Sequence, residues 1–538
     1  MNVAQLVAQS LIENDIDQLY CLPGVQNDDF FNALYDLQNQ VTPIHARHEQ
    51  GAVYMALGAA LATGKPQAFS IVPGPGFLNG TAALSTAYAV NAPLMSLIGQ
   101  IPSGAINKGF GLLHEIQGQS EMLGSLTKSS DMITDGGQAA AQVQEAWNQV
   151  KSGRPRPVGL EVPVNVWRQE ANGEIVGQIL PAPQAAPADI DKAADLIRAA
   201  SAPMIAVGSG AQHMSAAVKA FAEQLGAPVM AFRTGHGVVS SDHDLRIDMP
   251  TGHKLWPGCD LIIGLGTRLQ PQRQVWGMDD NVKVIHIDID PEELTRITTP
   301  DVAICADLAE ALPLLLDALG PQPARQDWRD HVANTKAQMH AELTTTLAPQ
   351  SAWLQAIRQA LPRDGIFVDE LTQVGYVSRI LFPTYVPRGF LSSGYQGTLG
   401  WGIATALGAA HARRDVPVVS IAGDGGSLFT ISELATAVRH NIPVNYAIFN
   451  DNAFGNVRRF QIENYDNRPI ASDLVNPDFV ALAQSFGVTA ERAETPDGLR
   501  AALGRAIDND GPNLIEVPMS DNVPSPWPYI MLPKVRGV

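Results

Sequence analysis

The stretch VVSIAGDGGS, residues 418–427, decides the fold of this chain because it forms the first half of a β-α-β unit. Its apolar beginning is typical of a buried strand, and its glycines predict a tight turn. Apolar residues at helical spacing follow as far as Val438, and the breaker Asn441-Ile442-Pro443 ends that helix. A second apolar run, Val444–Phe449, predicts the next strand, which ends at Asn450-Asp451-Asn452.

A carboxylate follows each of these two strands, Asp424 after the first and Asp451 after the second. Ligands of open α/β sheets bind at the carboxyl ends of parallel strands, where both residues are expected. The adjoining Gly423, Gly425, Gly426 and Ser427 would let a phosphate approach the backbone and a helix N-terminus. Mg²⁺ prefers oxygen ligands that it shares with phosphates, so we predict a magnesium-diphosphate site. The alternative is that these residues form only a tight turn and a capping turn.

The same alternation of short apolar runs and helical patterns continues along the chain. It predicts an α/β protein with three doubly wound parallel-sheet domains, at residues 1–170, 188–325 and 350–538. A proline-containing stretch, Gln178–Asp189, separates the first two. The expected strands are Gln18–Leu22, Ala68–Val72, Leu94–Ile98, Val158–Val162, Pro203–Val207, Pro228–Ala231, Leu261–Leu265, Val282–Ile287, Gly365–Val368, Val416–Ile421, Val444–Phe449 and Asn513–Glu516.

Composition excludes several classes of protein. The 538 residues carry a net charge of −18, which argues against a nucleic-acid or anionic-membrane surface. The three cysteines show no metal-ligand spacing and their odd number argues against a disulfide framework, which favours a reducing cytoplasm. The N-terminus lacks the features of a signal peptide, and no apolar run approaches the roughly 20 residues of a membrane span. We therefore expect a cytoplasmic protein.

A second notable stretch is His45-Ala46-Arg47-His48-Glu49-Gln50-Gly51-Ala52, which precedes an apolar helical pattern. Taken alone, Glu49 is a first-turn helix acid that is favourable beside the helix dipole. Together with the other motifs it has a different meaning. Four groups of residues resemble motifs of the thiamine-diphosphate enzymes that include acetolactate synthase, pyruvate decarboxylase and benzoylformate decarboxylase. They occur in the order of that family and span essentially the whole chain: Leu22-Pro23-Gly24, the Glu49 stretch, Gly74-Pro75-Gly76 with Asn79-Gly80, and Gly423-Asp424-Gly425 with Asn450-Asp451.

This resemblance implies the domain order and the cofactors. Residues 1–170 would bind the pyrimidine, 188–325 would be the central domain, and 350–538 would bind the diphosphate. The cofactors would be thiamine diphosphate and Mg²⁺. Since the active site of the family lies between two subunits, we expect at least a homodimer and favour a homotetramer.

The resemblance also implies roles for individual residues. Glu49 would bond to N1′ of the aminopyrimidine and activate the cofactor. Asp424, Asp451 and the main-chain carbonyl of Ala453 would ligate the metal, although the family typically has Asn where this chain has Asp451. Leu399, in Gly397-Thr398-Leu399-Gly400, would support the bent cofactor, or would be ordinary core. The cofactor-binding set is therefore Glu49, Pro23, Gly74, Asn79, Leu399, Gly423, Asp424, Gly425, Gly426, Ser427, Asp451 and Ala453.

The substrate pocket is less well defined. His114-Glu115 resembles a His-His pair of some members, so either residue could relay protons or contact substrate, although His114 could equally be structural. Gln117 is a weaker candidate. Val72 stands where benzoylformate decarboxylase has a catalytic histidine, and Val457 stands where pyruvate decarboxylases have a glutamate. Arg458 or Arg459 could hold a substrate carboxylate or lie on a solvated helix face.

These departures favour an acetolactate-synthase-like enzyme that decarboxylates a 2-oxo acid and ligates the product to an aldehyde or a second 2-oxo acid. The alternatives are a non-ligating 2-oxo acid decarboxylase of benzoylformate-decarboxylase type and a catalytically inactive, cofactor-binding regulatory protein. In the central domain, Gly208-Ser209-Gly210 and Gly264-Leu265-Gly266 are weak indications of a dinucleotide. The segment from Thr234-Gly235-His236-Gly237 through Asp260 is short beside the flavin-binding type of this family, so FAD is not expected.

Overall fold

The computed structural model describes residues 1–173, 175, 178–520 and 523–537, and its parallel sheets with interleaved helices confirm the predicted α/β class. Val538, the last residue of the expected third domain, lies outside the described residues. The chain divides into two compact units. The first unit comprises Met1–Pro181, Ser393–Ala493 and Ala502–Pro518, and the second unit comprises Ala182–Ser392, Glu494–Ala501 and Met519–Val538.

The N-terminal sheet of the first unit is entirely parallel and has the order β2-β1-β3-β4-β6-β5. The strand order reverses between β1 and β3, which is where open α/β sheets form a ligand crevice. The central strand β4 is buried along its whole length, as expected for a strand covered by helices on both faces. The strands are β1 (Gln18–Cys21), β2 (Thr42–His45), β3 (Gln67–Ile71), β4 (Leu94–Gln100), β5 (Ser130–Met132) and β6 (Val158–Pro163).

The helices of this part have clear local signals at their ends. The helix α3 begins at Glu49, where the His48 side chain accepts the N–H of Gln50 at 3.1 Å, and ends at Gly64 in the left-handed conformation. Helix α4 begins at Pro75, whose missing N–H costs nothing in the first turn. The helices are α1 (Val3–Glu13), α2 (Asp28–Tyr35), α3 (Glu49–Thr63), α4 (Pro75–Ala89), α5 (Gln119–Leu126) and α6 (Ala139–Lys151).

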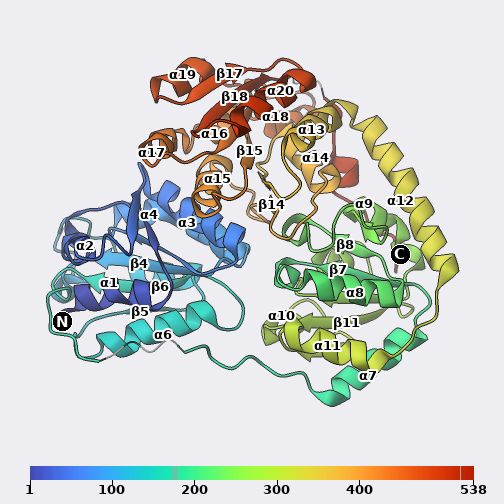
Figure 1. Ribbon diagram of the computed structural model, residues 1–538, viewed down its shortest axis with the longest axis horizontal. Coiled ribbons are helices and arrows are strands. Elements are labelled where there is room, and N and C mark those ends of the chain that lie inside the picture. The colour runs from blue at the N-terminus through green and yellow to red at the C-terminus, as the bar shows by residue number, and fades with distance from the viewer. Residues whose placement is uncertain (174, 176–177, 521–522, 538) are drawn as a thin grey trace. The chain divides into compact units, whose positions relative to one another are not determined.

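The C-terminal part of the first unit contains the parallel strands β15-β16-β18-β17 in that order. Its helix α15 packs along α3 of the N-terminal part (Figure 1). Glycines allow this approach, because a Cβ on Gly58 would lie 2.0 Å from the carbonyl oxygen of Thr405. The elements are α15 (Trp401–Ala412), β15 (Val418–Gly423), α16 (Asp424–Ser427), α17 (Leu434–Arg439), β16 (Asn445–Asn450), α18 (Gly455–Asn464), α19 (Phe479–Ser485), β17 (Thr489–Arg492), α20 (Pro496–Ile507), of which residues 502–507 belong to this unit, and β18 (Asn513–Pro518).

The second unit contains a parallel sheet of order β12-β11-β10-β7-β8-β9 and a further parallel pair, β13 with β14. Its strands are β7 (Pro203–Val207), β8 (Val229–Ala231), β9 (Arg246–Ile247), β10 (Leu261–Leu265), β11 (Lys283–Asp288), β12 (Val302–Cys305), β13 (Ile366–Val368) and β14 (Phe390–Leu391). Its helices are α7 (Pro187–Ala199), α8 (Ser215–Leu225), α9 (Met249–Leu255), α10 (Pro291–Thr295), α11 (Leu308–Leu319), α12 (Gln326–Thr346), α13 (Ala348–Ala360) and α14 (Gln373–Leu381).

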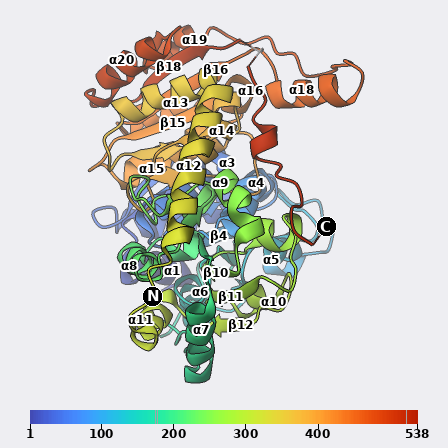
Figure 2. The same cartoon turned by 90° about the vertical axis from the view of Figure 1, so that its right-hand side faces the viewer.

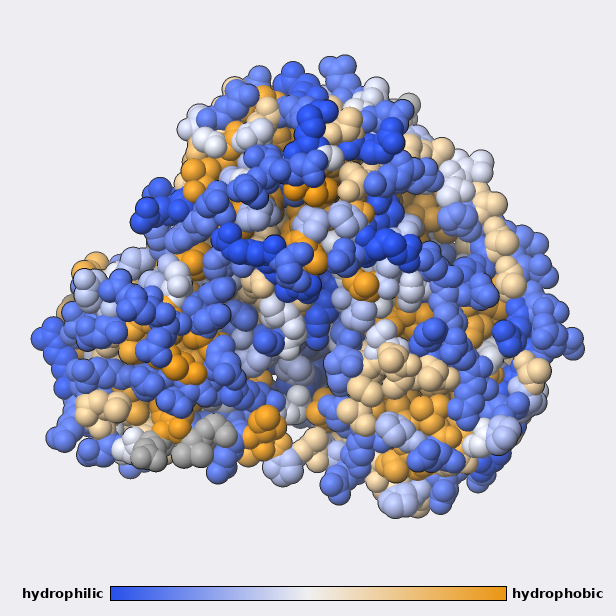
Figure 3. Space-filling view, viewed as in Figure 1, coloured by the Kyte–Doolittle hydropathy of each residue, from blue (hydrophilic) through white to orange (hydrophobic). Residues whose placement is uncertain are grey.

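The surface is mixed. Hydrophilic residues cover most of the face in view in Figure 3, and hydrophobic residues gather in small groups between them. Among the described residues, none of the helices combines the length and the apolar character that a membrane crossing requires.

Candidate functional site

The two predicted carboxylates meet at the carboxyl ends of β15 and β16. These strands pair in parallel with Gly423 opposite Phe449, so the residues that follow them emerge at the same edge of the sheet. Asp424 opens the short helix α16 and is only 2% exposed. The carboxyl of Asp451 lies within hydrogen-bonding reach of the carboxyl of Asp424.

Both carboxylates are held in a setting that disfavours their charge. Burial, together with the charge of Asp424, raises the pKa of Asp451 to about 6. Burial also raises the pKa of Asp424, against the opposing effect of a hydrogen bond from Asn476. A buried and a partly buried acid that repel each other in this way would be stabilised in their ionised form by a divalent cation.

Asn476 completes this site, although it belongs to no motif by which it could have been identified beforehand. Its Nδ2 donates to Asp424 Oδ2 at 2.6 Å and to Asn450 Oδ1 at 2.9 Å. Its Oδ1 is buried without a hydrogen-bond partner, an acceptor that would suit a metal-bound water or the metal itself. Together with the carboxylates, this orphaned oxygen makes the donor set fit Mg²⁺.

Main-chain groups contribute to the same edge. The backbone of Ala453 hydrogen-bonds to both carboxylates, which places this predicted residue at the site. Within the described part of the chain, three or more His, Cys, Asp or Glu side chains nowhere converge in a metal-binding group. A metal at this site would therefore depend on the two aspartates together with amide, carbonyl or ligand oxygens.

The predicted phosphate turn is tightly packed. A Cβ on Gly425 would lie 2.6 Å from the ring of Phe454, so only glycine fits there. The hydroxyl of Ser427 donates to the carbonyl oxygen of Asp424 at 2.9 Å and is fully buried. The conformation of the turn is therefore fixed by the Ser427–Asp424 hydrogen bond and by the Phe454 ring that packs on Gly425.

The predicted catalytic acid lies in the N-terminal part of the same unit. Glu49, the first residue of α3, is 8% exposed, and its Oε2 accepts the side-chain N–H of Asn79 at 2.9 Å. Asn79 lies on α4, so two helices fix this pair. The structure brings together these two residues, which the resemblance had assigned to the cofactor.

The loops after β1 and β3 close around Glu49. A Cβ on Gly76 would lie 2.6 Å from Val72 Cγ2 and 3.1 Å from Glu49 Oε1. A Cβ on Gly24, beside Pro23, would lie 2.5 Å from Val72 Cγ1. Both glycines are therefore needed for Val72 to fill the space beside the acid, at the point where the strand order of the sheet reverses.

The loop with His114 and Glu115 lies against the beginning of α4. The main chain of His114 adopts a left-handed conformation with φ 67°, and a Cβ on Gly74 would lie 2.3 Å from the carbonyl oxygen of His114. A positive φ is uncommon outside glycine, although histidine adopts it more often than most residues do. The Nδ1 of His114 is buried without a partner, which leaves it available to a ligand.

Glu115 is engaged by its own loop. Its carboxylate accepts the N–H groups of Leu112 at 2.9 Å, Gly109 at 2.9 Å and Phe110 at 3.3 Å. The hydrogen bond from Leu112, and those from the neighbouring N–H groups, lower the pKa of Glu115. These contacts favour a role in ordering the loop.

A buried network beneath this loop was not apparent in the sequence. Glu161 is 1% exposed and accepts hydrogen bonds from Gln119 at 2.7 Å, from Gln100 at 3.1 Å and from Ser120. Gln119 also accepts the backbone N–H of Gly74 at 2.8 Å and donates to the carbonyl oxygen of Gly99. Gln119, two residues beyond the weaker candidate Gln117, therefore joins the predicted pocket loop to the start of α4. Burial raises the pKa of Glu161.

Two other predicted positions are exposed or partly exposed in the single chain. Leu399 is 37% exposed, so it does not belong to the chain's own core, and the hydroxyl of its neighbour Thr398 shares a 2.6 Å hydrogen bond with that of Tyr54. None of the side chains of α18 is buried, and this helix projects from its part of the molecule (Figure 2). Within α18, Arg458 pairs with Asp473 at 3.4 Å, which favours the solvated-helix interpretation of that arginine.

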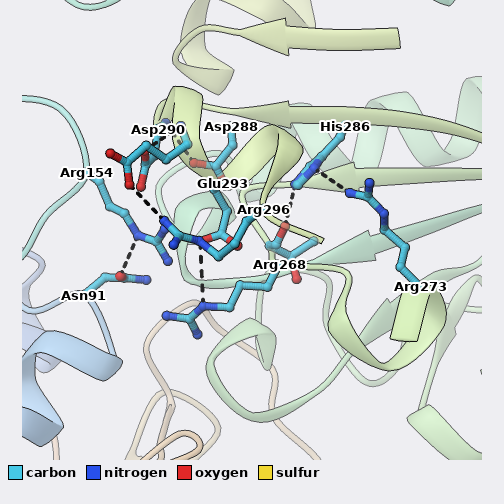
Figure 4. Close-up of polar contacts among 11 residues, drawn as sticks. Asn91, Arg154, Arg268, Arg273, His286, Asp288, Asp290, Glu293 and Arg296 are labelled. Carbon is cyan, nitrogen blue, oxygen red and sulfur yellow. Dashed lines mark hydrogen bonds and ion pairs between the residues drawn. The ribbon is translucent and has the colours of Figure 1, made fainter. Parts of the chain in front are cut away.

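The polar residues that follow Gly264-Leu265-Gly266 in the second unit form ion pairs with one another (Figure 4). Arg268 and Arg296 approach the buried Glu293 at 3.9 and 3.6 Å. His286 contacts Arg273 at 3.3 Å, and burial lowers its pKa. These contacts give the cluster a structural role within the central sheet.

The chain matches family models along most of its length. Residues 1–122 match the N-terminal TPP binding domain of thiamine pyrophosphate enzymes, residues 190–315 match their central domain, and residues 372–517 match their C-terminal TPP binding domain.

Full-length relatives are also found. A probable 2-ketoarginine decarboxylase of Pseudomonas aeruginosa is 30% identical over 536 residues, covering 96% of this chain and 94% of the relative. The acetolactate synthase isozyme 2 large subunit of Escherichia coli is 29% identical, with 98% and 97% covered. A probable acetolactate synthase large subunit of Methanocaldococcus jannaschii is 30% identical, with 96% and 92% covered.

Proposed function

The chain belongs to the thiamine pyrophosphate enzyme family, and we propose from this premise that it is a thiamine-diphosphate- and Mg²⁺-dependent enzyme that decarboxylates a 2-oxo acid. We further propose that it ligates the product to a second carbonyl compound, an aldehyde or another 2-oxo acid.

The observation that carries this proposal is that the first unit contains two separate acidic sites. Two mutually repelling carboxylates, the buried Asp424 and the partly buried Asp451, follow adjacent strands, and a separate buried acid, Glu49, is fixed by Asn79. The first pair suits a cation and a diphosphate, and the single acid suits an exchange of protons. Bound there, thiamine diphosphate would supply a stabilised carbanion, which the protein alone cannot provide.

The side chains then have separate tasks. Asp424 and Asp451, with the main chain of Ala453, would hold Mg²⁺, while Gly423, Gly425, Gly426 and Ser427 would let the diphosphate approach the backbone. Asn79 occupies Oε2 of Glu49, so Oε1 is the atom at which this acid would hold or release a proton toward the aminopyrimidine. Pro23 and Gly74 would shape the wall around it, and Leu399 would support the bend of the cofactor.

Ligation is favoured by two apolar side chains. Val72 stands where the resemblance places the histidine of simple decarboxylases, and it is 6% exposed beside Glu49. Val457 stands where the resemblance places their glutamate, and it is half exposed. Without these groups, protonation of the decarboxylated fragment would be slower, which leaves time for a second carbonyl compound to react. His114 and Glu115 would border the space for that acceptor.

A second candidate is simple decarboxylation. It is supported by the full-length similarity to a relative named as a probable 2-ketoarginine decarboxylase. On this reading, the 2-oxo acid would carry a guanidinium group, and the product would be the free aldehyde.

Product analysis separates these candidates. The purified chain, with thiamine diphosphate and Mg²⁺, would be given pyruvate, 2-ketoarginine and a panel of other 2-oxo acids, each with and without an aldehyde. Release of CO₂ with acetolactate or acetoin would support ligation, and CO₂ with aldehyde alone would support decarboxylation. Cofactor binding without any CO₂ release would favour an inactive regulatory protein and refute both.

We also propose a cytoplasmic homo-oligomer, at least a dimer and preferentially a tetramer. Apolar side chains close in sequence to the predicted residues His114 and Ser427 are exposed in the single chain, among them Phe110 and Leu113 at 66% and Phe429 at 51%. A second copy would cover them. Light scattering on the purified protein should give a mass of two or four chains, and a monomeric mass at micromolar concentration would refute this proposal.

A further inference from the structure

A buried carboxylate outside the predicted site, that of Glu433, binds the main chain directly before Glu49. Glu433 follows α16 in a short 3₁₀ turn, Ile431–Glu433, and is 0% exposed. Its Oε1 accepts the backbone N–H of His48 at 3.0 Å and that of Arg47 at 3.1 Å. Its Oε2 lies 3.1 Å from the same Arg47 nitrogen and accepts the hydroxyl of Thr436 at 2.6 Å.

This arrangement fixes the entry of the chain into α3. The bonded N–H groups belong to the two residues immediately before Glu49, the first residue of the helix. A carboxylate at this end is favoured by the helix dipole, and its hydrogen bonds are charge-assisted. Burial raises the pKa of Glu433, and hydrogen bonds from Thr436, Arg47 and His48 oppose that rise. A buried carboxylate is tolerated only when donors surround it, as they do here.

A glycine in α3 makes room for this carboxylate. A Cβ on Gly51 would lie 2.2 Å from Glu433 Oε1 and 2.5 Å from its Cδ. Any side chain at position 51 would therefore displace the carboxylate from the N–H groups of Arg47 and His48. The fit depends on the pair Gly51 and Glu433 rather than on either residue alone.

The rest of α3 packs closely against a neighbouring helix. Along its length it packs against α15, where a Cβ on Gly408 would lie 1.9 Å from the carbonyl oxygen of Met55. The carboxylate of Glu49 is fixed separately by Asn79. The stretch before α3 is held in part by the N–H of Ala46, which donates to the carbonyl oxygen of Cys21 at 2.9 Å, and by the hydroxyl of Thr436, which donates to the carbonyl oxygen of His45 at 3.5 Å. Glu433 accepts the N–H groups of Arg47 and His48, the two residues next to Glu49.

We propose that Glu433 is a positioning residue for Glu49: it holds the N-terminus of α3 so that the Glu49 carboxylate stays in register with Asn79 and with the bound aminopyrimidine. This inference rests on the proposed function, because Glu49 needs a defined position only if it exchanges protons with a cofactor. A displacement of about 1 Å at such a group costs about 10²-fold in rate.

The test compares Glu433→Ala, Glu433→Gln, Gly51→Ala and the double variant Glu433→Ala/Gly51→Ala. Gly504→Ala in α20 is the matched control, since a Cβ there meets no atom within 4 Å. Three quantities are measured on the full chain: backbone hydrogen exchange of peptides covering residues 45–51 without cofactor, the Kd for thiamine diphosphate with Mg²⁺, and kcat and KM for the best 2-oxo acid.

We expect Glu433→Ala and Gly51→Ala to speed exchange of residues 47 and 48 by about tenfold or more, and to lower kcat by 10- to 100-fold, with Kd and KM changed by less than about threefold. Glu433→Gln keeps one acceptor oxygen and should fall between Glu433→Ala and the wild type. Gly51→Ala should cost nothing further in the Glu433→Ala background, because the clash is gone. Gly504→Ala should match the wild type.

Three results would overturn the inference. They are unchanged exchange at residues 47 and 48 in Glu433→Ala, a fall in kcat that equals a rise in Kd, and independent, multiplicative losses in the double variant. If Glu433→Ala does not fold, Gly51→Ala and Glu433→Gln carry the same test. Failure of the wild-type chain to bind thiamine diphosphate would refute the proposed function instead, and the exchange data would still report on the anchor.

Discussion

Replacing Asp451 by asparagine tests the electrostatics of the predicted metal site. Asp451 has a pKa raised from 3.8 to about 6, chiefly by burial and then by the charge of Asp424. A shift of this size corresponds to about 3 kcal/mol against the ionised form. Asparagine has the same shape and keeps an oxygen ligand, and it removes this cost. It is also the residue that the family typically has at this position.

The sign of the effect follows from proton binding. Between about pH 4 and pH 6, the folded protein holds a proton on Asp451 that the unfolded chain has already lost. Stability without metal must therefore fall as the pH rises through this window, and the loss is complete above pH 6. The Asp451→Asn variant should lack this loss and be more stable than the wild type at pH 7.5, by up to about 3 kcal/mol, yet equally stable below pH 4.

Binding of magnesium should remove the proton from Asp451. At pH 6 about half of the Asp451 side chains are protonated, so Mg²⁺ binding with thiamine diphosphate should release about half a proton from this group, and almost none at pH 8. Calorimetric titrations in buffers of different ionisation enthalpy count these protons, and thermal unfolding from pH 4 to 8 measures stability. Identical unfolding profiles for the two proteins, or equal proton release from the asparagine variant at pH 6, would refute this reasoning.

Three further predictions concern the cofactor acid, the buried network and the phosphate turn. Glu49→Gln should bind thiamine diphosphate within a few-fold of the wild type and lose about 10²- to 10⁴-fold in turnover, because the amide cannot exchange a proton; near-normal steady-state activity would contradict the role of Glu49. Gln119→Ala leaves the N–H of Gly74 without its acceptor and should lower the free energy of unfolding by about 1–3 kcal/mol in urea titrations; an unchanged midpoint would show that the network is dispensable. Gly425→Ala places a methyl group 2.6 Å from the Phe454 ring and should weaken Mg²⁺-dependent cofactor binding at least tenfold by calorimetry, a result that an unaltered Kd would exclude.

Central strands were predictable because their signal is local. The expected strands Pro203–Val207 and Leu261–Leu265 match β7 and β10 residue for residue, since each is a continuous apolar run buried on both faces. The edge strands β5 and β17 were not predicted. Most of their residues are at least partly exposed, and they are strands only because a neighbour offers hydrogen bonds.

The residues of the candidate site also fall into those that local sequence predicted and those that it did not. The glycines and the two aspartates after β15 and β16 could be predicted because parallel neighbouring strands end at one edge of a sheet, whatever the rest of the fold does. The role of Glu49 could be inferred only from resemblance, since its partner Asn79 reaches it from another helix. The involvement of Glu115 with its own loop depends on a turn conformation that its residues do not encode individually.

The sequence by itself determined the α/β class, the central strands and the residue types available for a metal and a proton. Only the tertiary structure decided which distant groups complete the site: Asn476, 52 positions from Asp424, and Glu433, 386 positions from Arg47. The physical reason is the range of each effect. Periodicity and turn chemistry act over a few residues, whereas the donors that satisfy a buried carboxylate are whichever groups the packing of separate elements brings within 3 Å of it.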